Sequence, residues 1–278
     1  MIKIGLATWT DHPALANGKK KLTLPEYATH FPIVEVDSSF YSVPKAAWIE
    51  KWINEVPEKF QFIVKANYAM TKTPMTRFGK MTDEIRSQRF SDFIKVIQPM
   101  AAAGKLASIL FQFPPSFKCN NDSIQYIRQV RQVMEDLPIS VEFRNDSWFA
   151  GEEVTKDTSA FLRSLKMTQV VVDEPHAASN GVPLVPVVTT PEFAFIRLHG
   201  RNEAAWAKGT MGRYRYDYNQ TELEEIAKVA TDLAKDAKEV AVIFNNNAGH
   251  NAAPNALTLK QILNQNDADL ASMQLDLF

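Results

Sequence analysis

The stretch Ser108-Ile109-Leu110-Phe111-Gln112-Phe113 decides the fold, because it is almost continuously apolar. Such a run is expected of a strand in a parallel sheet that is covered on both faces. Val170-Val171-Val172 repeats the pattern further along the chain. Eight short β-rich runs recur, each bounded by turn or loop residues: Ile2–Ala7, Ile33–Asp37, Phe60–Lys65, Ser108–Phe113, Ile139–Phe143, Gln169–Asp173, Phe193–Leu198 and Val240–Phe244.

Segments with helical periodicity separate these runs. Thr82 opens one of them, and Thr221 followed by Glu224 has the spacing of a capping box that opens another. Eight strands alternating with helices predict an α/β fold, a (β/α)8 TIM barrel, because the count of eight favours closure over a doubly wound open sheet. The first strand is followed by no glycine-rich phosphate fingerprint, which further disfavours a Rossmann-type sheet.

The bulk composition is that of one cytosolic domain. The 278 residues suit a single barrel, predicted over residues 1–264, with a polar tether and tail over 265–278. A net charge of -1 gives no global basic field that would attract nucleic acid, and no run approaches the roughly 20 apolar residues of a membrane span. The single cysteine, Cys119, excludes an intrachain disulfide and is expected to be an inert loop thiol.

Polar residues gather where the predicted strands end, and the longer loops (residues 8–21, 67–80, 175–191 and 200–219) follow strands. In a barrel this is the face that carries active sites. Three polar pairs are spaced two apart, which places both members on the same side of a strand. If that side is the barrel interior, these groups converge; the alternative is a polar layer of ion pairs without turnover. The pairs are Glu35/Asp37, Glu142/Arg144 and Arg197/His199.

His199 lies at a strand end between Arg197 and Arg201. The two cations are expected to lower its pKa and keep it neutral, as suits a general base or a hydrogen-bond donor. Both arginines suit a phosphate or carboxylate held in a fork. The other interpretation of His199 is a structural hydrogen bond to a neighbouring loop.

A metal site has less support from the sequence. The five histidines contain no closely spaced pair with zinc-ligand spacing. Asp173, Glu142, His199 and His250 are a conceivable carboxylate-rich set, so a divalent metal stays open but unsupported, and no cofactor is evident. Aromatic residues on the loops, Trp148 and Trp206 among them, are typical both of stacking platforms and of loop anchors.

Several ordered motifs resemble the YecE-like family, domain of unknown function 72. They run over most of the chain: residues 34–41 (Val-Glu-Val-Asp-Ser-Ser-Phe-Tyr), 111–117 (Phe-Gln-Phe-Pro-Pro-Ser-Phe), 141–144 (Val-Glu-Phe-Arg) with Ser147-Trp148, 197–201 (Arg-Leu-His-Gly-Arg) and 244–247 (Phe-Asn-Asn-Asn). The resemblance implies a TIM barrel, similar to those of endonuclease IV and xylose isomerase relatives, and supplies no reaction. It implies these signature polar positions: Glu35, Lys65, Gln112, Glu142, Arg144, Asp173, Arg197, His199 and Asn246. Residues 67–72 depart from the histidine-bearing loop that the family pattern predicts there.

The last residues, Gln274-Leu275-Asp276-Leu277-Phe278, resemble the pentapeptide with which bacterial replication and repair proteins bind the sliding clamp. Leu277 and Phe278 suit an apolar cleft, and Gln274 suits a hydrogen bond at its rim. The alternative is an apolar strip that folds back onto the barrel.

Together these patterns predict a hydrolase or lyase that acts on a small polar, phosphorylated or nucleic-acid-related ligand and is recruited to the clamp, with DNA as a conceivable partner. A non-catalytic ligand-binding module and a carbohydrate-active barrel are the alternatives. We predict catalytic roles for Glu142, His199 and Asp173. We predict ligand-binding roles for Glu35, Lys65, Gln112, Arg144, Trp148, Arg197, Arg201 and Asn246.

Overall fold

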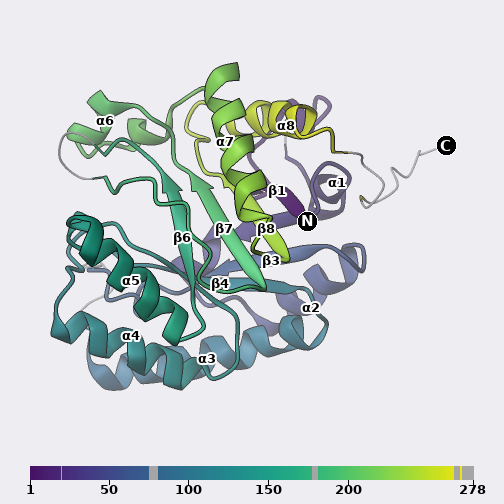
Figure 1. Cartoon of the computed structure of the whole chain (residues 1–278). Coiled ribbons are helices and arrows are strands. Elements are labelled where there is room, and N and C mark those ends of the chain that lie inside the picture. The colour runs from purple at the N-terminus through teal and green to yellow at the C-terminus, as the bar shows by residue number, and fades with distance from the viewer. Residues whose placement is uncertain (20, 75–80, 177–180, 266–269, 271–278) are drawn as a thin grey trace.

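Eight parallel strands form a closed barrel in the computed structural model, which describes residues 1–19, 21–74, 81–176, 181–265 and 270 (Figure 1). Each strand pairs with the next in the sequence, and β8 pairs with β1 to close the sheet. The TIM-barrel prediction is therefore confirmed. The strands are β1 (Ile2–Ala7), β2 (Ile33–Val36), β3 (Gln61–Lys65), β4 (Leu106–Gln112), β5 (Ile139–Glu142), β6 (Thr168–Asp173), β7 (Phe193–Leu198) and β8 (Glu239–Phe244).

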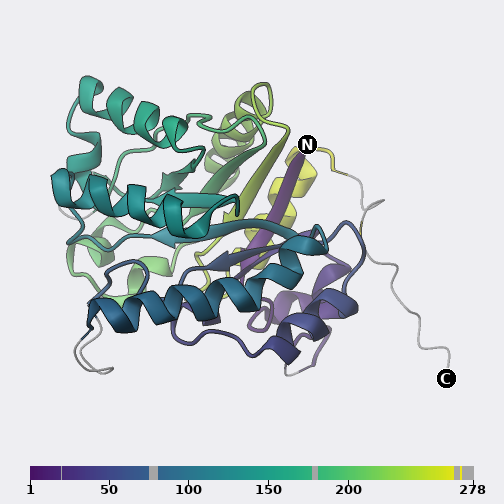
Figure 2. The ribbon, with the colours of Figure 1, turned by 90° about the horizontal axis from the view of Figure 1, so that it is seen from below.

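Helices surround the strands and cover their outer face (Figure 2). They are α1 (Leu24–Ala28), α2 (Ala46–Glu55), α3 (Asp83–Ala102), α4 (Asn121–Met134), α5 (Glu152–Ser164), α6 (Glu203–Ala207), α7 (Gln220–Leu233) and α8 (Ala252–Ile262). Short 3-10 turns lie in the loops: η1 (Pro13–Leu15), η2 (Asp37–Phe40), η4 (Asp146–Phe149) and η5 (Met211–Tyr214). In the described part of the chain, no helix has the length and apolar character that crossing a membrane requires.

Side-chain hydrogen bonds set where two of these helices begin. The Thr82 hydroxyl accepts from the Ile85 backbone N–H, so α3 begins where the sequence predicts. The predicted capping box at Thr221 and Glu224 is wrong by two residues. Asn219 caps α7, because its side chain accepts from the Glu222 N–H while the Glu222 carboxylate accepts from the Asn219 N–H.

Alternating side chains divide the apolar core into two layers, as the period of a strand requires. Side chains such as Ile33, Leu110 and Phe195 pack together inside the barrel. Their neighbours along each strand belong to the larger core cluster that also contains helix residues. The barrel wall approaches closely at Gly5, where an added Cβ would lie 2.2 Å from the Ile33 carbonyl oxygen. Any larger residue at position 5 would therefore force β1 away from β2.

Candidate functional site

The inward-facing layer changes from apolar to polar at the carboxyl ends of the strands. Glu35 follows Ile33 by two residues, and Arg197 follows Phe195 by two, so both continue the interior faces of their strands. The polar side chains that the spacing of two predicted to converge inside the barrel do so on these strands. We refer to the following as the strand-end cluster: Glu35, Asp37, Lys65, Gln112, Glu142, Arg144, Glu174, Arg197, His199 and Asn245.

Arg197 is the centre of this cluster and is completely buried. Its guanidinium forms a fork on Glu35, with Nε 2.8 Å from Oε2 and Nη2 2.6 Å from Oε1. The remaining nitrogen, Nη1, donates to Glu142 Oε2 at 2.5 Å and to Gln112 Oε1 at 2.9 Å. Side chains from three other strands, β2, β4 and β5, thereby bind the one cation on β7. Glu142 forms ion pairs with both Arg144 and Arg197, as expected of a polar layer of ion pairs.

His199 lies beside Glu142, with Nε2 3.1 Å from Oε1. Its Nδ1 faces the Asn245 side-chain amide at 3.0 Å, and with the amide nitrogen placed there Nδ1 accepts and Nε2 carries the proton. Arg144 Nη1 lies 3.3 Å from the same Nε2, but both atoms then carry hydrogens, so Arg144 donates to Glu142 Oε1 instead. Glu142 therefore orients the histidine in one tautomer.

Burial lowers the pKa of His199 to about 3, and the nearby charges of Arg144 and Arg197 add to the effect. The predicted direction and the neutral state are confirmed. The predicted cause needs correction, because burial rather than the flanking cations contributes most to the lowering. A histidine that stays neutral and donates to Glu142 is a hydrogen-bonding group rather than a proton acceptor at neutral pH.

Glu174 belongs to this cluster, although the sequence did not predict it. Its Oε2 lies 2.9 Å from Arg144 Nη2, and its Oε1 accepts from the Val182 backbone N–H at 2.8 Å. Burial raises the pKa of Glu174 to about 7, and Glu142 adds to the rise while Arg144 opposes it. The period of two along β6 places Glu174 on the same face as Val170 and Val172, but only the structure shows that this face points inward.

The pKa of Glu142 moves in the opposite direction. Burial opposes its ionisation, but Arg197 and His199 outweigh burial and hold this pKa well below the usual range. Glu142 and Glu174 thus flank the same Arg144 guanidinium with their pKa values driven apart. In active sites this arrangement distinguishes an ionised carboxylate from a carboxyl that carries a proton.

Lys65 and Asp37 form a second pair at the β2–β3 side of the cluster, with Nζ 2.9 Å from Oδ1. Burial raises the pKa of Asp37, but Lys65 and Arg197 outweigh it and hold this pKa at about 2. The Lys65 ammonium also lies 5.1 Å from the Phe40 ring centroid. The lysine predicted to bind a ligand is therefore already neutralised by a carboxylate within the protein.

Residues 202–214, which contain α6 and η5, cover the cluster; we call this segment the roof. The His199 ring centroid lies 6.4 Å from that of Trp206 and 6.0 Å from that of Tyr214. The Arg144 guanidinium lies 4.9 Å from the Trp206 ring. Trp206 is 4% exposed and His199 is fully buried, so a ligand that reaches His199 must displace part of the roof.

Asp173 does not join the cluster, although we predicted a catalytic role for it. Asp173 lies two residues after Val171, which packs in the outer core layer. The two side chains share one face of β6, so Asp173 points away from the barrel interior. Its carboxylate binds Arg201 through Nε at 3.0 Å and Nη2 at 2.7 Å, and it accepts from the Tyr218 hydroxyl at 2.7 Å. Arg201, predicted to bind a ligand, is thus occupied in holding the start of the β7–α7 loop.

Trp148 and Asn246 also lie outside the cluster. The Trp148 ring stacks on Phe143 at a centroid distance of 4.0 Å, and its indole N–H donates to the Phe117 carbonyl, so it is a core residue. Asn246 donates to the Tyr216 carbonyl and to Asn255. The neighbouring Asn245 faces His199 instead, because it follows the inward-facing Ile243 by two residues.

No common metal position is formed by three or more His, Cys, Asp or Glu side chains in the described ranges. Of the set that we considered from the sequence, Glu142 and His199 meet, but Asp173 faces outward. His250 lies 3.7 Å from Asp11 at the exposed surface. The carboxylates of the cluster bind arginine or lysine side chains.

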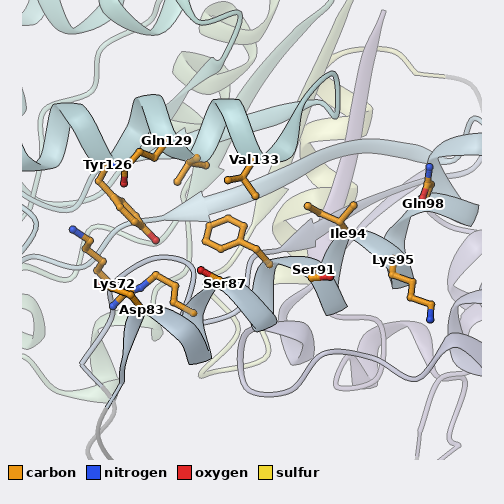
Figure 3. A pocket seen from close by; sticks show the side chains of 13 residues that line it. Lys72, Asp83, Ser87, Ser91, Ile94, Lys95, Gln98, Tyr126, Gln129 and Val133 are labelled. Carbon is orange, nitrogen blue, oxygen red and sulfur yellow. The ribbon is translucent and has the colours of Figure 1, made fainter.

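A groove of about 700 Å³ lies elsewhere, between α3 and α4 on the outside of the barrel (Figure 3). Phe90, Ile94 and Val133 line it together with Lys72, whose ammonium lies 4.1 Å from the Tyr126 ring. None of the predicted site residues lines this groove. We therefore place the candidate site at the strand ends, where the perturbed carboxyls are.

The predicted clamp-binding residues Gln274, Leu275, Asp276, Leu277 and Phe278 lie outside the described residues. Among the described residues, the side-chain amide of Gln265 donates to the Ile2 carbonyl at 2.8 Å. The first residue of the predicted tether is therefore bound to the base of β1.

Comparison with known proteins places these features in one family. The family model described as "Protein of unknown function DUF72" matches residues 3–275. The UPF0759 protein YunF of Bacillus subtilis is 40% identical over 289 residues, which cover 100% of both chains. The UPF0759 protein YecE of Escherichia coli is 25% identical over 73% of this chain and 75% of its own.

Solved structures agree with the family match. A crystal structure of a DUF72 family protein from Enterococcus faecalis has a TM-score of 0.91 at 35% identity, covering 99% of this chain and 100% of that one. A DUF72 family protein from Thermotoga maritima has a TM-score of 0.79 at 29% identity, covering 95% and 100%.

Proposed function

Because the chain belongs to the DUF72 family of proteins of unknown function, we propose its activity from its own side chains. We propose that it is a hydrolase or lyase that acts by proton transfer on a small, phosphorylated or nucleic-acid-related ligand. The reaction would take place at the strand-end cluster, beneath the roof. One observation carries this proposal: Glu142 and Glu174 flank Arg144 with pKa values driven in opposite directions.

Glu174 is the proton donor in this proposal. With a pKa of about 7 it carries a proton in a large fraction of molecules at neutral pH, and it can give that proton to a leaving oxygen. In a hydrolytic step the bond to that oxygen breaks, water supplies the hydroxyl to the other fragment, and the remaining water proton returns to Glu174. Of the residues for which we predicted catalytic roles, Asp173 takes no part in this step. His199 donates a hydrogen bond to Glu142 rather than accepting a proton.

Glu142 has a supporting role in the same step. It stays ionised, orients His199 through Nε2 and holds Arg144 and Arg197 in place. A fixed negative charge beside Glu174 also favours the protonated form of that residue. Removing the Glu142 charge is therefore expected to lower the pKa of Glu174 as well as to free His199.

The test is turnover on a panel of phosphomonoesters, nucleotides and damaged DNA, with Glu174→Gln as the decisive variant. Glutamine keeps the size of the side chain and removes the titrating proton, so we expect the rate to fall by about 10²–10⁴-fold. Glu153→Gln, at an exposed carboxylate on α5, is the matched control. A panel substrate that turns over equally fast with Glu174→Gln would refute the assignment.

Recruitment to the sliding clamp is a proposal that rests on the sequence of residues 274–278 alone. Calorimetric titration of the full chain with a bacterial clamp, and of a chain that ends at residue 273, tests it. We expect micromolar binding by the full chain and none after truncation. Equal binding by both chains, or none by either, would remove the tail from the proposal.

A ligand-binding module without turnover is the second candidate, and the charge pairing favours it. Arg197, Lys65 and Arg144 each contact carboxylates of the cluster, as expected of a stable polar layer. This candidate predicts saturable ligand binding that survives Glu174→Gln, with no reaction on any member of the panel. The carbohydrate-active alternative has less support, because Trp148 and Trp206, which suggested sugar stacking, are both buried.

A further inference from the structure

Two guanidinium groups contact the same indole in the roof. Arg144 lies 4.9 Å from the Trp206 ring centroid and Arg213 lies 5.4 Å from it. Arg213 also lies 4.8 Å from the Tyr214 ring. Cations accumulate on an aromatic face because the ring quadrupole attracts them, but two cations on one ring also repel each other. An anion beside them would remove that repulsion.

The side chains of Trp206 and of the two arginines that contact it each have a buried N–H group with no hydrogen-bond partner among the described residues. The groups are Arg144 Nε, Trp206 Nε1 and Arg213 Nε. All three are donors that cannot accept, so only an acceptor can satisfy them. A buried donor without a partner is costly, and three in one cluster are unusual in a folded protein.

Arg213 differs from the other arginines near the strand ends. Arg144, Arg197 and Arg201 each form ion pairs with carboxylates. Arg213 forms none with the described carboxylates, and its closest described partners are the two aromatic rings. Its positive charge nevertheless acts on Glu174 and lowers the pKa of that carboxyl, although burial, which raises this pKa, outweighs it.

We propose that Arg144, Trp206 and Arg213 form a subsite for a phosphate group of the ligand. A phosphate offers several acceptor oxygens to the three donors. It also offers a negative charge that can pair with the guanidinium of Arg213. Arg144 also binds Glu174 at 2.9 Å, so the subsite would hold the phosphate near the proton donor. This inference rests on the proposed function for the identity of the ligand. The anion-binding role that the sequence predicted for Arg197 and Arg201 passes to Arg144, Trp206 and Arg213.

The roof must move for the phosphate to enter, since the three donors are buried in this structure. Gly200 and Gly209 lie before and within the roof, with φ of +92° and +61°. An added Cβ at Gly200 would lie 2.5 Å from Tyr216 Cβ, so the roof begins at a close approach that only glycine allows.

The experiment is calorimetric titration of the full chain with inorganic phosphate, a nucleoside monophosphate and a short single-stranded DNA. The variants are Arg213→Gln, which removes the free charge, and Trp206→Phe, which keeps a ring and removes the indole N–H. Arg215→Gln is the matched control, because Arg215 lies next to the roof with an exposed side chain. Near-ultraviolet circular dichroism establishes that each variant is folded.

We expect phosphate binding that weakens roughly tenfold or more in Arg213→Gln, severalfold in Trp206→Phe and less than about twofold in Arg215→Gln. Stronger binding of the monophosphate than of the DNA would identify a terminal phosphate as the ligand group, and the reverse order a phosphodiester. Equal losses in Arg213→Gln and Arg215→Gln would show non-specific attraction and overturn the subsite. Absence of binding by all three probes would overturn it too.

Turnover measured in parallel separates the two proposals. Phosphate binding through Arg213 combined with unchanged turnover in Glu174→Gln would retain the subsite and refute the proton-transfer assignment. Loss of turnover in Glu174→Gln combined with unchanged phosphate binding in Arg213→Gln would retain the proton-transfer assignment and refute the subsite.

Discussion

Glu142 and Arg197 form a fully buried ion pair at the carboxyl end of the barrel, with Oε2 2.5 Å from Nη1. Arg197 also binds Glu35, so one cation lies between two carboxylates. Such a cluster is stable only while every member is paired, because an unpaired charge in the interior is strongly unfavourable.

Arg197→Gln is expected to destabilise the protein by about 3–5 kcal/mol, because Glu35 and Glu142 then lose their shared cation. Urea unfolding measured by circular dichroism gives this free energy. Lys228→Gln is the control, since its ion pair with Asp232 is exposed and its loss is expected to change stability little. Equal effects of the two substitutions would contradict the central role of Arg197.

Glu174 predicts a pH dependence of stability with a definite sign. Burial raises its folded pKa to about 7, above the value of about 4.3 for an unfolded glutamate. The folded state therefore binds more protons between these values, and stability falls as pH rises from about 4.5 to about 7. Glu174→Gln removes the titrating group, so the fall in the free energy of unfolding over this pH range should be smaller by roughly 2–3 kcal/mol.

The measurement is the free energy of unfolding of both chains at intervals between pH 4.5 and 8. Glu35, whose pKa burial also raises to about 7, stays in both chains and leaves a residual slope. The difference between the chains therefore isolates Glu174. Parallel stability curves would show that Glu174 titrates normally in the folded protein.

Trp148 is predicted to contribute to stability rather than to ligand binding. Trp148→Ala removes a ring that stacks on Phe143 and Phe117, and we expect a loss of about 3–5 kcal/mol. Trp48→Ala, at a side chain that is 53% exposed, should change stability by less than about 0.5 kcal/mol. Thermal unfolding distinguishes the two, and a stability-neutral Trp148→Ala would return this residue to the ligand-binding set.

Asp173 and Arg201 are predicted to act as one structural unit. Because Arg201 forms a two-pronged contact with Asp173, the substitutions Asp173→Asn and Arg201→Gln should not add independently. A double-mutant cycle of unfolding free energies is expected to give a coupling of about 0.5–3 kcal/mol. Additive effects would mean that the contact contributes nothing to stability and that Asp173 is available for another role.

The sequence was sufficient for the barrel because its local patterns repeat. Apolar runs such as Ile109-Leu110-Phe111 require cover on both faces, and eight of them alternating with helices leave a closed parallel barrel as the favoured arrangement. The period of two along a strand also predicted that Glu142, Arg197 and His199 share an interior with their neighbours. These features depend on residues close together in the chain, which is why a single sequence reveals them.

The tertiary structure decided which polar residues belong to the site. Asp173 and Glu174 are adjacent, yet they face opposite sides of the barrel wall, and only the packing of Val171 and Val172 shows which one faces inward. Likewise only the fold brings Arg213 and Trp206 over Arg144. The raised pKa of Glu174 depends on burial and on charges from other strands, so composition and spacing did not reveal it.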